Sequence, residues 1–580
     1  MRLLLNLCIA LAILLPVSPV YADDLDDFIR EQLRKRHVPG LSLAIIQDGK
    51  IVKAQTYGFI DKTGKTPLTT STLFQAGSIS KAVAAVGALH LTEAGKLALD
   101  EDVNAKLRTW KVPENDLTKE KKVTLRGLLS HTTGLTVHGF PGYEVGSAIP
   151  TVTQILDGSS PANTAPVRVD FVPGTRWRYS GGGYTVMQQL VVDVTGKPFP
   201  LFMQETVLGP LAMTESTYEQ PLPAGKAKAT ATGYYGDRAE VKGRWHIYPE
   251  MAAAGLWTTP SDLARFAIGI QNAFAGKPGS VLSQQMARQM LTDQKANDGL
   301  GVFLQGEGHA MRFGHNGRDE GFDALLTAGA ETGQGVVIMI NANDNSRMMN
   351  RIAEAVAKKY NWPGNSVTPP ASRTAVPVTA QALTAYEGRY EFANNQMITF
   401  LAGKDRLFTL SDNFEDEEFV PETPTRFASV DGDTYLTFTP DAKGQVTELV
   451  LKQGKQERKI PRIGPLFHTS APLPDPNQAR TQQIQTALLA MARGGKEVIE
   501  TPGIAPGARR GFASGTRALA GLKTIQFINA EDASKRGIER HDGKVAQVLN
   551  YKLVTDTVPH YVLVYLTSDE LVTDCDVVDR

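Results

Sequence analysis

The sequence predicts an α+β protein in which three folded units follow a short leader. Two proline-rich stretches, Asn365–Pro377 and Ile463–Asn477, have neither helical nor alternating periodicity, which is typical of linkers. The segments that they separate differ in pattern. The first mixes helices and strands, the second alternates short β-rich runs with Gly and Asp turns, and the third ends in strands. The predicted units are 23–364, 378–462 and 478–580.

The composition excludes several classes of function. The 580 residues include 61 basic and 61 acidic ones, so the chain lacks the positive charge with which proteins bind nucleic acids. It has no P-loop, no dinucleotide-binding fingerprint and no HExxH motif, and we expect neither a cofactor nor a metal ion. The expected partners are therefore small molecules or peptides.

The first 22 residues have the pattern of a secretory signal peptide. Arg2 precedes the apolar run Leu3–Leu15, and Ala22 ends the segment at the predicted cleavage site. The run is shorter than the roughly 20 apolar residues that a membrane-spanning helix needs. We expect a secreted protein, in the bacterial periplasm, that is not an integral membrane protein after cleavage. Cleavage removes Cys8 and leaves Cys575, interpreted as structural, as the single cysteine.

The first unit begins with two elements that local patterns predict. Apolar residues recur at helical spacing near Asp24–Lys35, which indicates an amphipathic helix. A hairpin follows, because the turn signal Asp48-Gly49 lies between the strand patterns Leu41–Gln47 and Lys50–Tyr57.

The two later units are β-rich and contain no constellation of catalytic residues. The second is predicted to be a small antiparallel barrel or sandwich, and the third an α+β unit with one long helix. The runs that predict them are Met397–Leu401, Arg406–Leu410 and Thr434–Phe438 in the second unit, and Thr481–Arg493, Val545–Thr555 and His560–Thr567 in the third.

The segment that carries chemistry starts at Gly77. Strong helix formers follow it, so Ser78 is predicted in the first turn of a helix, with Lys81 three residues later on the same face. A hydroxyl is a poor nucleophile until a base removes its proton, and a desolvated amine one turn away can act as that base. The start of the helix also offers backbone N–H groups to an oxyanion.

Two further segments complete a possible site. Tyr179 precedes a predicted helix that runs to about Thr195, and its phenol can share a proton with Lys81 in a cleft. The segment from His315 to Arg318 has the pattern of a sheet edge. Gly317 would let a substrate approach the backbone closely, and the N–H group of Arg318 could complete an oxyanion hole.

In this order, the segments resemble the three motifs of the serine β-lactamase and penicillin-binding-protein superfamily. The resemblance is to its class C-like branch of esterases, D-aminopeptidases and carboxypeptidases. It implies a mostly antiparallel sheet with flanking helices, an inserted helical lobe, and an active site between them. It spans about residues 30–345 and rests on Ser78-x-x-Lys81, Tyr179-Ser180-Gly181, His315-Asn316-Gly317, and the recurring segments Val38–Ser42, Leu128–Leu135, Phe171–Gly174 and Ala254–Thr259.

The resemblance also implies a role for each matching residue. Ser78 would be the nucleophile, Lys81 and Tyr179 would handle its proton, and the N–H groups of Ser78 and Arg318 would form the oxyanion hole. The implied reaction is acyl transfer to serine, followed by hydrolysis. His131 is interpreted as structural, and the implied substrate-binding positions are His315, Asn316, Gly317 and Gly181.

Two departures from the family pattern bear on the substrate. Gly181 stands where the β-lactamases usually have Asn, and His315 where a permanently charged Lys is usual. With an ordinary pKa near 6.5, His315 would be mostly neutral at pH 7. Both changes favour esters, small peptides or D-amino-acid derivatives over β-lactams, although Arg318 could supply a carboxylate anchor.

The sequence therefore predicts a secreted serine hydrolase that acts on esters or on small peptide or D-amino-acid amides. A β-lactamase or peptidoglycan D,D-peptidase is the alternative among enzymes. A catalytically inactive protein that binds cell-wall fragments is the alternative outside enzymes. Labelling of the serine, and turnover of the matching substrates, would discriminate among them.

Overall fold

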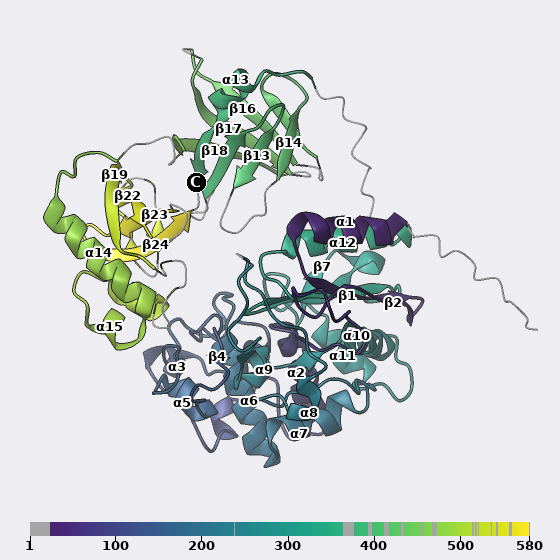
Figure 1. The fold of residues 1–580 in the computed structure, drawn as a ribbon. Helices are drawn as coiled ribbons and strands as arrows, with labels where there is room; N and C mark the ends of the chain where they lie inside the picture. The colour runs from purple at the N-terminus through teal and green to yellow at the C-terminus, as the bar shows by residue number, and fades with distance from the viewer. Residues whose placement is uncertain are drawn as a thin grey trace, which may run out of the picture.

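The structure is a computed structural model (Figure 1). The predicted signal peptide and most of the first predicted linker lie outside the residues that it describes. These are 24–363 except 237, and 376–578 except 392–396, 411–416, 431–433, 443, 454–455, 467–471, 513–515, 517–518, 520, 535, 537, 541–542 and 556–559.

An antiparallel sheet forms the centre of the region 24–363. Among the described residues it has six strands, in the spatial order β2-β1-β10-β9-β8-β7. The N-terminal hairpin has the predicted turn, with Asp48 and Gly49 at φ 53° and 67°. The strands are β1 (Gly40–Gln47), β2 (Lys50–Gly58), β7 (Phe303–Gln305), β8 (Arg312–Asp319), β9 (Phe322–Gly329) and β10 (Gly335–Ile340).

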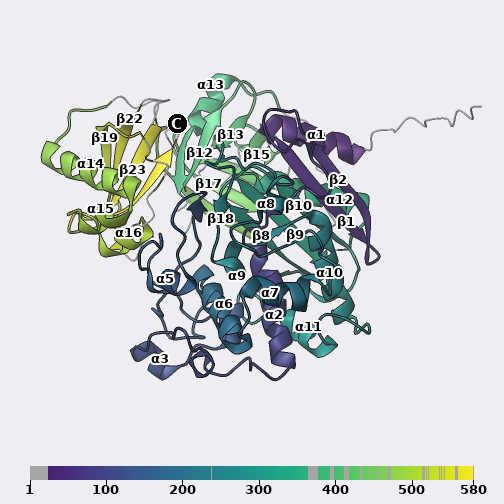
Figure 2. The same ribbon diagram turned by 60° about the horizontal axis from the view of Figure 1, so that its bottom comes forward.

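Helices cover both faces of this sheet (Figures 1 and 2). Successive side chains of a strand point to opposite faces, so in β1 Leu41 and Leu43 pack in one apolar cluster and Ala44 in another. The first cluster lies against α1 (Asp24–Arg36), the predicted N-terminal helix, and α12 (Ser346–Lys359). The second lies against α2 (Ile79–Glu93) and α10 (Pro260–Phe274).

A mostly helical lobe is inserted between β2 and β7 and lies below the sheet in Figure 1. It carries α6, which begins directly after Tyr179-Ser180, and α9, which lies beside α2. Its elements are α3 (Asp116–Glu120), α4 (Leu125–Leu129), α5 (Val152–Asp157), α6 (Gly181–Thr195), α7 (Phe199–Met203), α8 (Ala224–Ala227), α9 (Met251–Ala254), α11 (Gln284–Met290), β3 (Phe74–Gln75), β4 (Tyr143–Glu144), β5 (His246–Ile247) and β6 (Trp257–Thr258).

The second unit is a closed barrel, so the barrel alternative of the sequence prediction is correct. Eight described strands form it, and β11 closes the barrel by pairing with β18. Its interior is aromatic and includes Tyr390, Phe400 and Phe438. The elements are α13 (Ala380–Leu383), β11 (Gly388–Glu391), β12 (Met397–Ala402), β13 (Leu407–Leu410), β14 (Glu418–Pro421), β15 (Arg426–Ser429), β16 (Thr434–Pro440), β17 (Val446–Gln453) and β18 (Gln456–Gly464).

The third unit packs helix α14 against a sheet. Its described strands lie in the order β19-β22-β23-β24, and Cys575 of β24 is buried in the cluster that they form with α14. The elements are α14 (Gln478–Arg493), α15 (Gly495–Glu500), α16 (Pro506–Gly511), β19 (Thr524–Asp532), β20 (Glu539–Arg540), β21 (Gly543–Lys544), β22 (Gln547–Val554), β23 (His560–Leu566) and β24 (Val572–Val578).

Ion pairs connect the second unit to the third. The side chain of Arg389, in β11, is only 1% exposed and pairs with Glu531 of β19 at 2.7 Å. Arg536 pairs with Glu391 at 2.7 Å across the same boundary. Isolated surface pairs contribute little to stability, but a buried pair that loses one partner leaves a costly unpaired charge. The barrel and the C-terminal sheet are therefore coupled.

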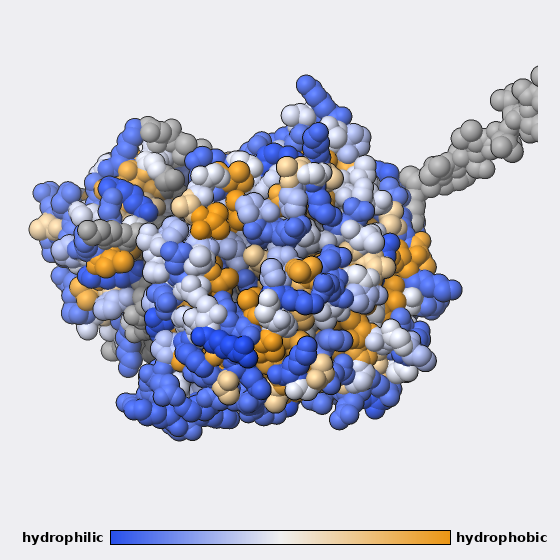
Figure 3. Space-filling model, turned by 90° about the horizontal axis from the view of Figure 1, so that it is seen from below, coloured by the Kyte–Doolittle hydropathy of each residue, from blue (hydrophilic) through white to orange (hydrophobic). Residues whose placement is uncertain are grey.

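On the face seen from below in Figure 3, hydrophobic residues lie among hydrophilic ones. Scattered apolar side chains of this kind are normal on folded domains. In the described ranges, no helix is both long and apolar enough to cross a membrane.

Candidate active site

The turn before α2 brings Ser78 against strand β8. Gly77 has φ +50°, a conformation that favours glycine, and Ser78 directly precedes the first residue of α2. A β-carbon on Gly77 would overlap the backbone nitrogen of Arg318, and one on Gly317 would overlap the carbonyl oxygen of Ala76. The two backbones are therefore in direct contact, and the N–H groups of Ser78 and Arg318 belong to adjoining segments.

Lys81 lies one helical turn after Ser78 and is 2% exposed. Its Nζ donates to Ser78 Oγ at 3.0 Å and to the carbonyl oxygen of Ala253 at 2.7 Å. Burial lowers the pKa of Lys81 to about 7, although the charge of Asp319 opposes the shift. A large fraction of Lys81 is therefore a neutral amine near pH 7, with its nitrogen in contact with the serine hydroxyl.

Tyr179 approaches the same pair from the loop before α6. Lys81 Nζ lies 5.0 Å from the centroid of its ring, and its hydroxyl forms a hydrogen bond with Ser78. Burial raises the pKa of Tyr179, an effect that this hydrogen bond only partly offsets. The phenol is therefore protonated at neutral pH. The structure brings together the three residues that the sequence predicted as catalytic.

Aromatic and imidazole rings surround Tyr179. Ring centroids of His131, His138, His315 and Phe303 lie 4.2, 4.9, 6.1 and 6.3 Å from that of Tyr179. The His131 Nδ1 accepts a hydrogen bond from the Ser180 N–H group at 3.1 Å. Burial, followed by the charge of Lys81, lowers the pKa of both His131 and His138. These rings pack around the site as neutral groups.

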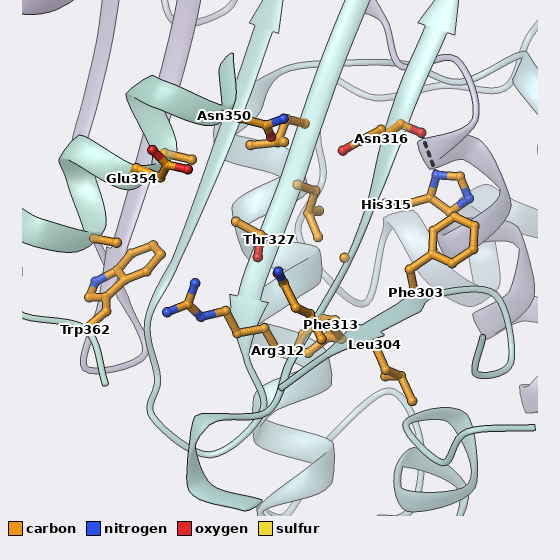
Figure 4. Close-up of a pocket in the computed structure, with 16 residues that line it drawn as sticks. Phe303, Leu304, Arg312, Phe313, His315, Asn316, Thr327, Asn350, Glu354 and Trp362 are labelled. Carbon is orange, nitrogen blue, oxygen red and sulfur yellow. Dashed lines mark hydrogen bonds between the residues drawn. The ribbon is translucent and has the colours of Figure 1, made fainter. Parts of the chain in front are cut away.

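His315 is a more firmly neutral residue than the sequence suggested. Only 6% of this residue is exposed. Burial, followed by the charge of Lys81, lowers the pKa of His315 to about 3. The ordinary pKa assumed from the sequence is therefore wrong for this position. The ring Nδ1 contacts the carbonyl oxygen of Asn316 (Figure 4), and since a carbonyl only accepts, Nδ1 carries the proton. The other ring nitrogen, Nε2, is then an acceptor.

The Arg318 side chain is already paired. Its guanidinium lies 2.6 Å from the carboxylate of Asp344, and both side chains are more than half exposed. Arg318 therefore does not present an isolated positive charge to a substrate carboxylate.

The other predicted substrate-binding positions differ in access. Asn316 is exposed, whereas Gly317 is buried against the turn before Ser78. Gly181 is also buried, and a β-carbon there would lie 3.0 Å from both the His138 carbonyl oxygen and the Phe140 ring. These groups occupy the space of a side chain at 181, so the expectation that Gly181 itself contacts substrate is not supported.

A hollow of about 620 Å³ lies beside the site, between strands β7 to β9 and α12 (Figure 4). Phe303, His315 and Asn316 are on its wall, together with the charged residues Arg312 and Glu354. Ser78, Lys81 and Tyr179 do not line it. Within the described residues, no group of three or more His, Cys, Asp or Glu side chains could hold a metal ion.

Sequence reasoning missed three parts of this site. The carbonyl of Ala253 is a backbone group without a side-chain signature, although the segment Ala254–Thr259, which resembles the family, follows it directly. His138 and Phe303 lie far from Tyr179 in sequence, and nothing in their local pattern indicated the contact. Asp319, four residues after His315, is buried, which raises its pKa, and its ionised form favours the charged form of Lys81.

Comparison with known proteins agrees with this geometry. Residues 25–360 match the Beta-lactamase family, which is more than half of the chain. The chain belongs to the Beta-lactamase family. Both the predicted family and the predicted α+β fold are thereby confirmed, and this Beta-lactamase region contains Ser78, Lys81, Tyr179 and His315.

Individual relatives of this Beta-lactamase family member are distant. Protein flp of Staphylococcus aureus (strain N315) is 25% identical over 337 residues, which are 55% of this chain and 63% of flp. The chain thus spans less than two thirds of that relative. PbpX of Bacillus subtilis (strain 168) is 24% identical over 55% of this chain and 74% of PbpX. The octameric penicillin-binding protein homologue from Pyrococcus abyssi has a similar fold, with a TM-score of 0.50 and 21% identity over 75% of this chain and 99% of its own.

Proposed function

We propose that this protein is a serine hydrolase that forms an acyl-enzyme on Ser78. We propose as its substrates uncharged esters or small peptide or D-amino-acid amides. One observation carries the proposal: the buried Lys81 Nζ lies 3.0 Å from Ser78 Oγ, and burial lowers the pKa of this lysine to about 7. A base with a pKa near the working pH is suited to remove the proton of the serine hydroxyl.

The first half of the reaction follows from this contact. Neutral Lys81 accepts the hydroxyl proton while Ser78 Oγ bonds to the substrate carbonyl carbon, and the carbonyl oxygen becomes an oxyanion. The N–H groups of Ser78 and Arg318 would donate to that oxyanion. The phenol of Tyr179, kept protonated by burial, can pass its proton to the leaving alcohol or amine and recover one from Lys81. The product is an ester of Ser78.

The second half reverses these roles. Water attacks the acyl carbon while the proton-handling pair accepts a proton from it, and the pair returns that proton to Ser78 Oγ as the bond to the acyl carbon breaks. The contact between Lys81 and Ala253 keeps the amine at the serine through both halves. The pair therefore returns to its starting protonation state after each turnover.

The charges around the site favour a substrate without a carboxylate. His315 is neutral because its pKa is about 3, and Arg318 is paired with Asp344. A β-lactam antibiotic or a peptidoglycan D,D-peptide carries a carboxylate that needs a cationic partner. A β-lactamase or D,D-peptidase is therefore the second candidate, supported by family membership, and an inactive binding protein for cell-wall fragments is the third.

A fluorophosphonate probe tests the proposal, because it reacts with an activated serine. Mass spectrometry is expected to find the phosphonyl group on Ser78, and Ser78→Ala should remove labelling together with hydrolysis of p-nitrophenyl esters. Removal of a serine nucleophile typically lowers kcat by several orders of magnitude. Labelling at another serine, or none in the folded protein, would reject the acyl-enzyme and favour the binding protein. Faster turnover of nitrocefin or of a D-alanyl peptide than of the ester would favour the second candidate.

Secretion is a separate part of the proposal and rests on the pattern of residues 1–22. Expression of the full chain in a bacterium, followed by N-terminal sequencing of the periplasmic fraction, is expected to give Asp23 as the first residue. Retention of the uncleaved chain in the cytoplasm would contradict it.

A further inference from the structure

The carbonyl group that holds Lys81 belongs to a very short helix. Helix α9 has four residues, Met251–Ala254, and its Ala253 oxygen accepts the 2.7 Å hydrogen bond from Lys81 Nζ. Helices of this length are not stable by themselves, because the first turn costs more conformational entropy than its few hydrogen bonds return. The position of the Ala253 carbonyl must therefore be set by contacts from outside α9.

The end of α9 is held by its neighbour α2. The Ser80 hydroxyl accepts a hydrogen bond from the N–H group of Leu256 at 3.0 Å, and the Leu256 carbonyl accepts one from Ala76 at 2.9 Å. Both contacts lie on the C-terminal side of Ala253. They do not fix the beginning of the helix.

One buried side chain from α6 contacts the beginning of α9, while Gln220 binds the backbone just outside the helix, at the Tyr248 N–H group and the Gly255 carbonyl oxygen. Gln188 is 1% exposed. Its Nε2 donates to the Pro249 carbonyl oxygen at 3.0 Å, and its Oε1 accepts from the Ala252 N–H group at 2.9 Å. Both ends of one amide thus bind the backbone on either side of the residue where α9 begins. A primary amide can do this because it carries a donor and an acceptor together.

Gln188 also connects α9 to the tyrosine motif. It lies on α6, whose first turn is capped by Ser180, the residue after Tyr179. The buried amide therefore ties the helix that follows Tyr179 to the segment that holds Lys81. We infer that Gln188 is a positioning residue, which holds the Ala253 carbonyl in register so that Lys81 stays on Ser78. The inference rests on the proposed function, because it concerns the same lysine.

The alternative is that Gln188 stabilises the fold by packing and has no effect on the position of Lys81. Gln189, the next residue, provides a matched control for this alternative. Gln189 lies on the same helix, is 6% exposed, and donates from Nε2 to Asp193 Oδ1 at 2.9 Å. Its side-chain hydrogen bond in the described part of the chain stays within α6 and does not reach α9. Gln188→Met and Gln189→Met each replace a buried amide by an apolar chain of similar length; the first removes two side-chain hydrogen bonds and the second removes one. Comparable losses of Tm are expected from both.

The two variants should differ in catalysis. Small misplacement of a catalytic group can lower a rate by about 100-fold, so we expect Gln188→Met to reduce kcat and the fluorophosphonate labelling rate of Ser78 by about 10- to 100-fold. KM should change little. A carbonyl acceptor favours the charged form of an amine, so its displacement should also move the acidic limb of the pH–rate profile to lower pH. Gln189→Met should retain the kcat of the wild-type protein, and the acidic limb of its pH–rate profile should not move.

A conservative variant separates loss of the hydrogen bonds from loss of the fold. Gln188→Glu keeps the length and the acceptor, and a buried carboxyl is favoured in its protonated form, which can also donate to Pro249. It should retain more activity than Gln188→Met.

Each outcome bears on the inference. Equal kcat, labelling rate and pH limb in wild type and Gln188→Met would overturn it, and so would equal losses in Gln188→Met and Gln189→Met. If Gln188→Met does not fold, the same comparison of Gln188→Glu with wild type decides. If the wild-type protein is not labelled on Ser78, the proposed function fails, and the inference fails with it. If the wild-type protein is labelled and the Gln188 variants behave like it, the inference alone fails.

Discussion

The backbone nitrogen of Arg318 lies 2.3 Å from the position that a β-carbon on Gly77 would take, so no β-carbon fits at position 77. Gly77 also has a positive φ of 50°. The two backbone groups that we assign to the oxyanion hole, the N–H groups of Ser78 and Arg318, therefore depend on one glycine. Sequence patterns alone did not indicate this dependence.

Gly77→Ala is expected to abolish acylation, because the new methyl group must push β8 away from Ser78. Gly95→Ala is the matched control, since Gly95 has a similar φ of +67° but no atom within 4 Å of an added β-carbon. The control should lose about 1–2 kcal/mol of stability from backbone strain alone and keep its activity. Fluorophosphonate labelling and thermal unfolding measure both effects. Equal labelling of the two variants would contradict the arrangement.

The pH dependence of kcat/KM should report the buried lysine. Burial lowers the pKa of Lys81 to about 7, and only its neutral form can accept a proton. Activity is therefore expected to be full above that value and to fall as the pH drops through about 7. Lys81→Arg should be nearly inactive, because a guanidinium stays charged.

The titration of Asp298 has to be distinguished from that of Lys81, because burial raises the pKa of Asp298 to about 7. Asp298→Asn keeps an acceptor for Trp177 Nε1, which donates to this carboxylate at 2.8 Å, but cannot ionise. The acidic limb should persist in this variant. A profile that is flat from pH 6 to 9, or a limb that disappears with Asp298, would rule out Lys81 as the titrating base.

Asp344→Asn tests whether Asp344 neutralises the cation beside the site. Without that carboxylate, Arg318 can attract a negatively charged substrate, and the kcat/KM ratio of a carboxylate ester to a matched uncharged ester should rise. Exposed ion pairs are weak, so we expect a change of about two- to five-fold that fades with added salt. Asp116→Asn, in an exposed pair with Lys119, should leave the ratio unchanged. Asp323 and Glu320 also act on the Arg318 charge, so no change in Asp344→Asn would show that removal of Asp344 alone does not free this cation for a substrate.

His315 should not act as a pH switch. Because burial and Lys81 lower its pKa to about 3, it stays neutral from pH 5 to 8, and the same ester ratio should be constant over this range. His315→Lys is expected to raise the ratio, with Tm measured alongside. A ratio that rises below pH 6.5 in wild type would show that the imidazole becomes charged in solution.

Local patterns predicted much of the fold and the core of the site. The N-terminal helix and the hairpin at Asp48-Gly49 were predictable because helical spacing and turn chemistry act over few residues. Ser78 and Lys81 were predictable for the same reason, since they lie one turn apart on one helix. Tyr179 required the resemblance, because its partners are about 100 residues away.

The remaining features depend on burial and on distant contacts, which a single sequence does not reveal. Ala253 is 172 residues from Lys81 and contributes only a backbone oxygen. The low pKa of His315 arises from its surroundings and not from its neighbours in sequence. The pairing of Arg318 with Asp344 turned an expected anchor into a balanced charge. In each case the residue was visible in the sequence, but its environment was not.

The buried pair of Arg389 and Glu531 limits how the chain can be shortened. A truncated protein that ends after the barrel would keep Arg389 but lose Glu531, the carboxylate with which it pairs at 2.7 Å. Removing one partner of a buried pair typically costs about 3–5 kcal/mol, a large part of the stability of a small domain. Deletion or exchange of domains should therefore treat the barrel and the C-terminal sheet as one module, or replace Arg389 by a neutral residue at the same time.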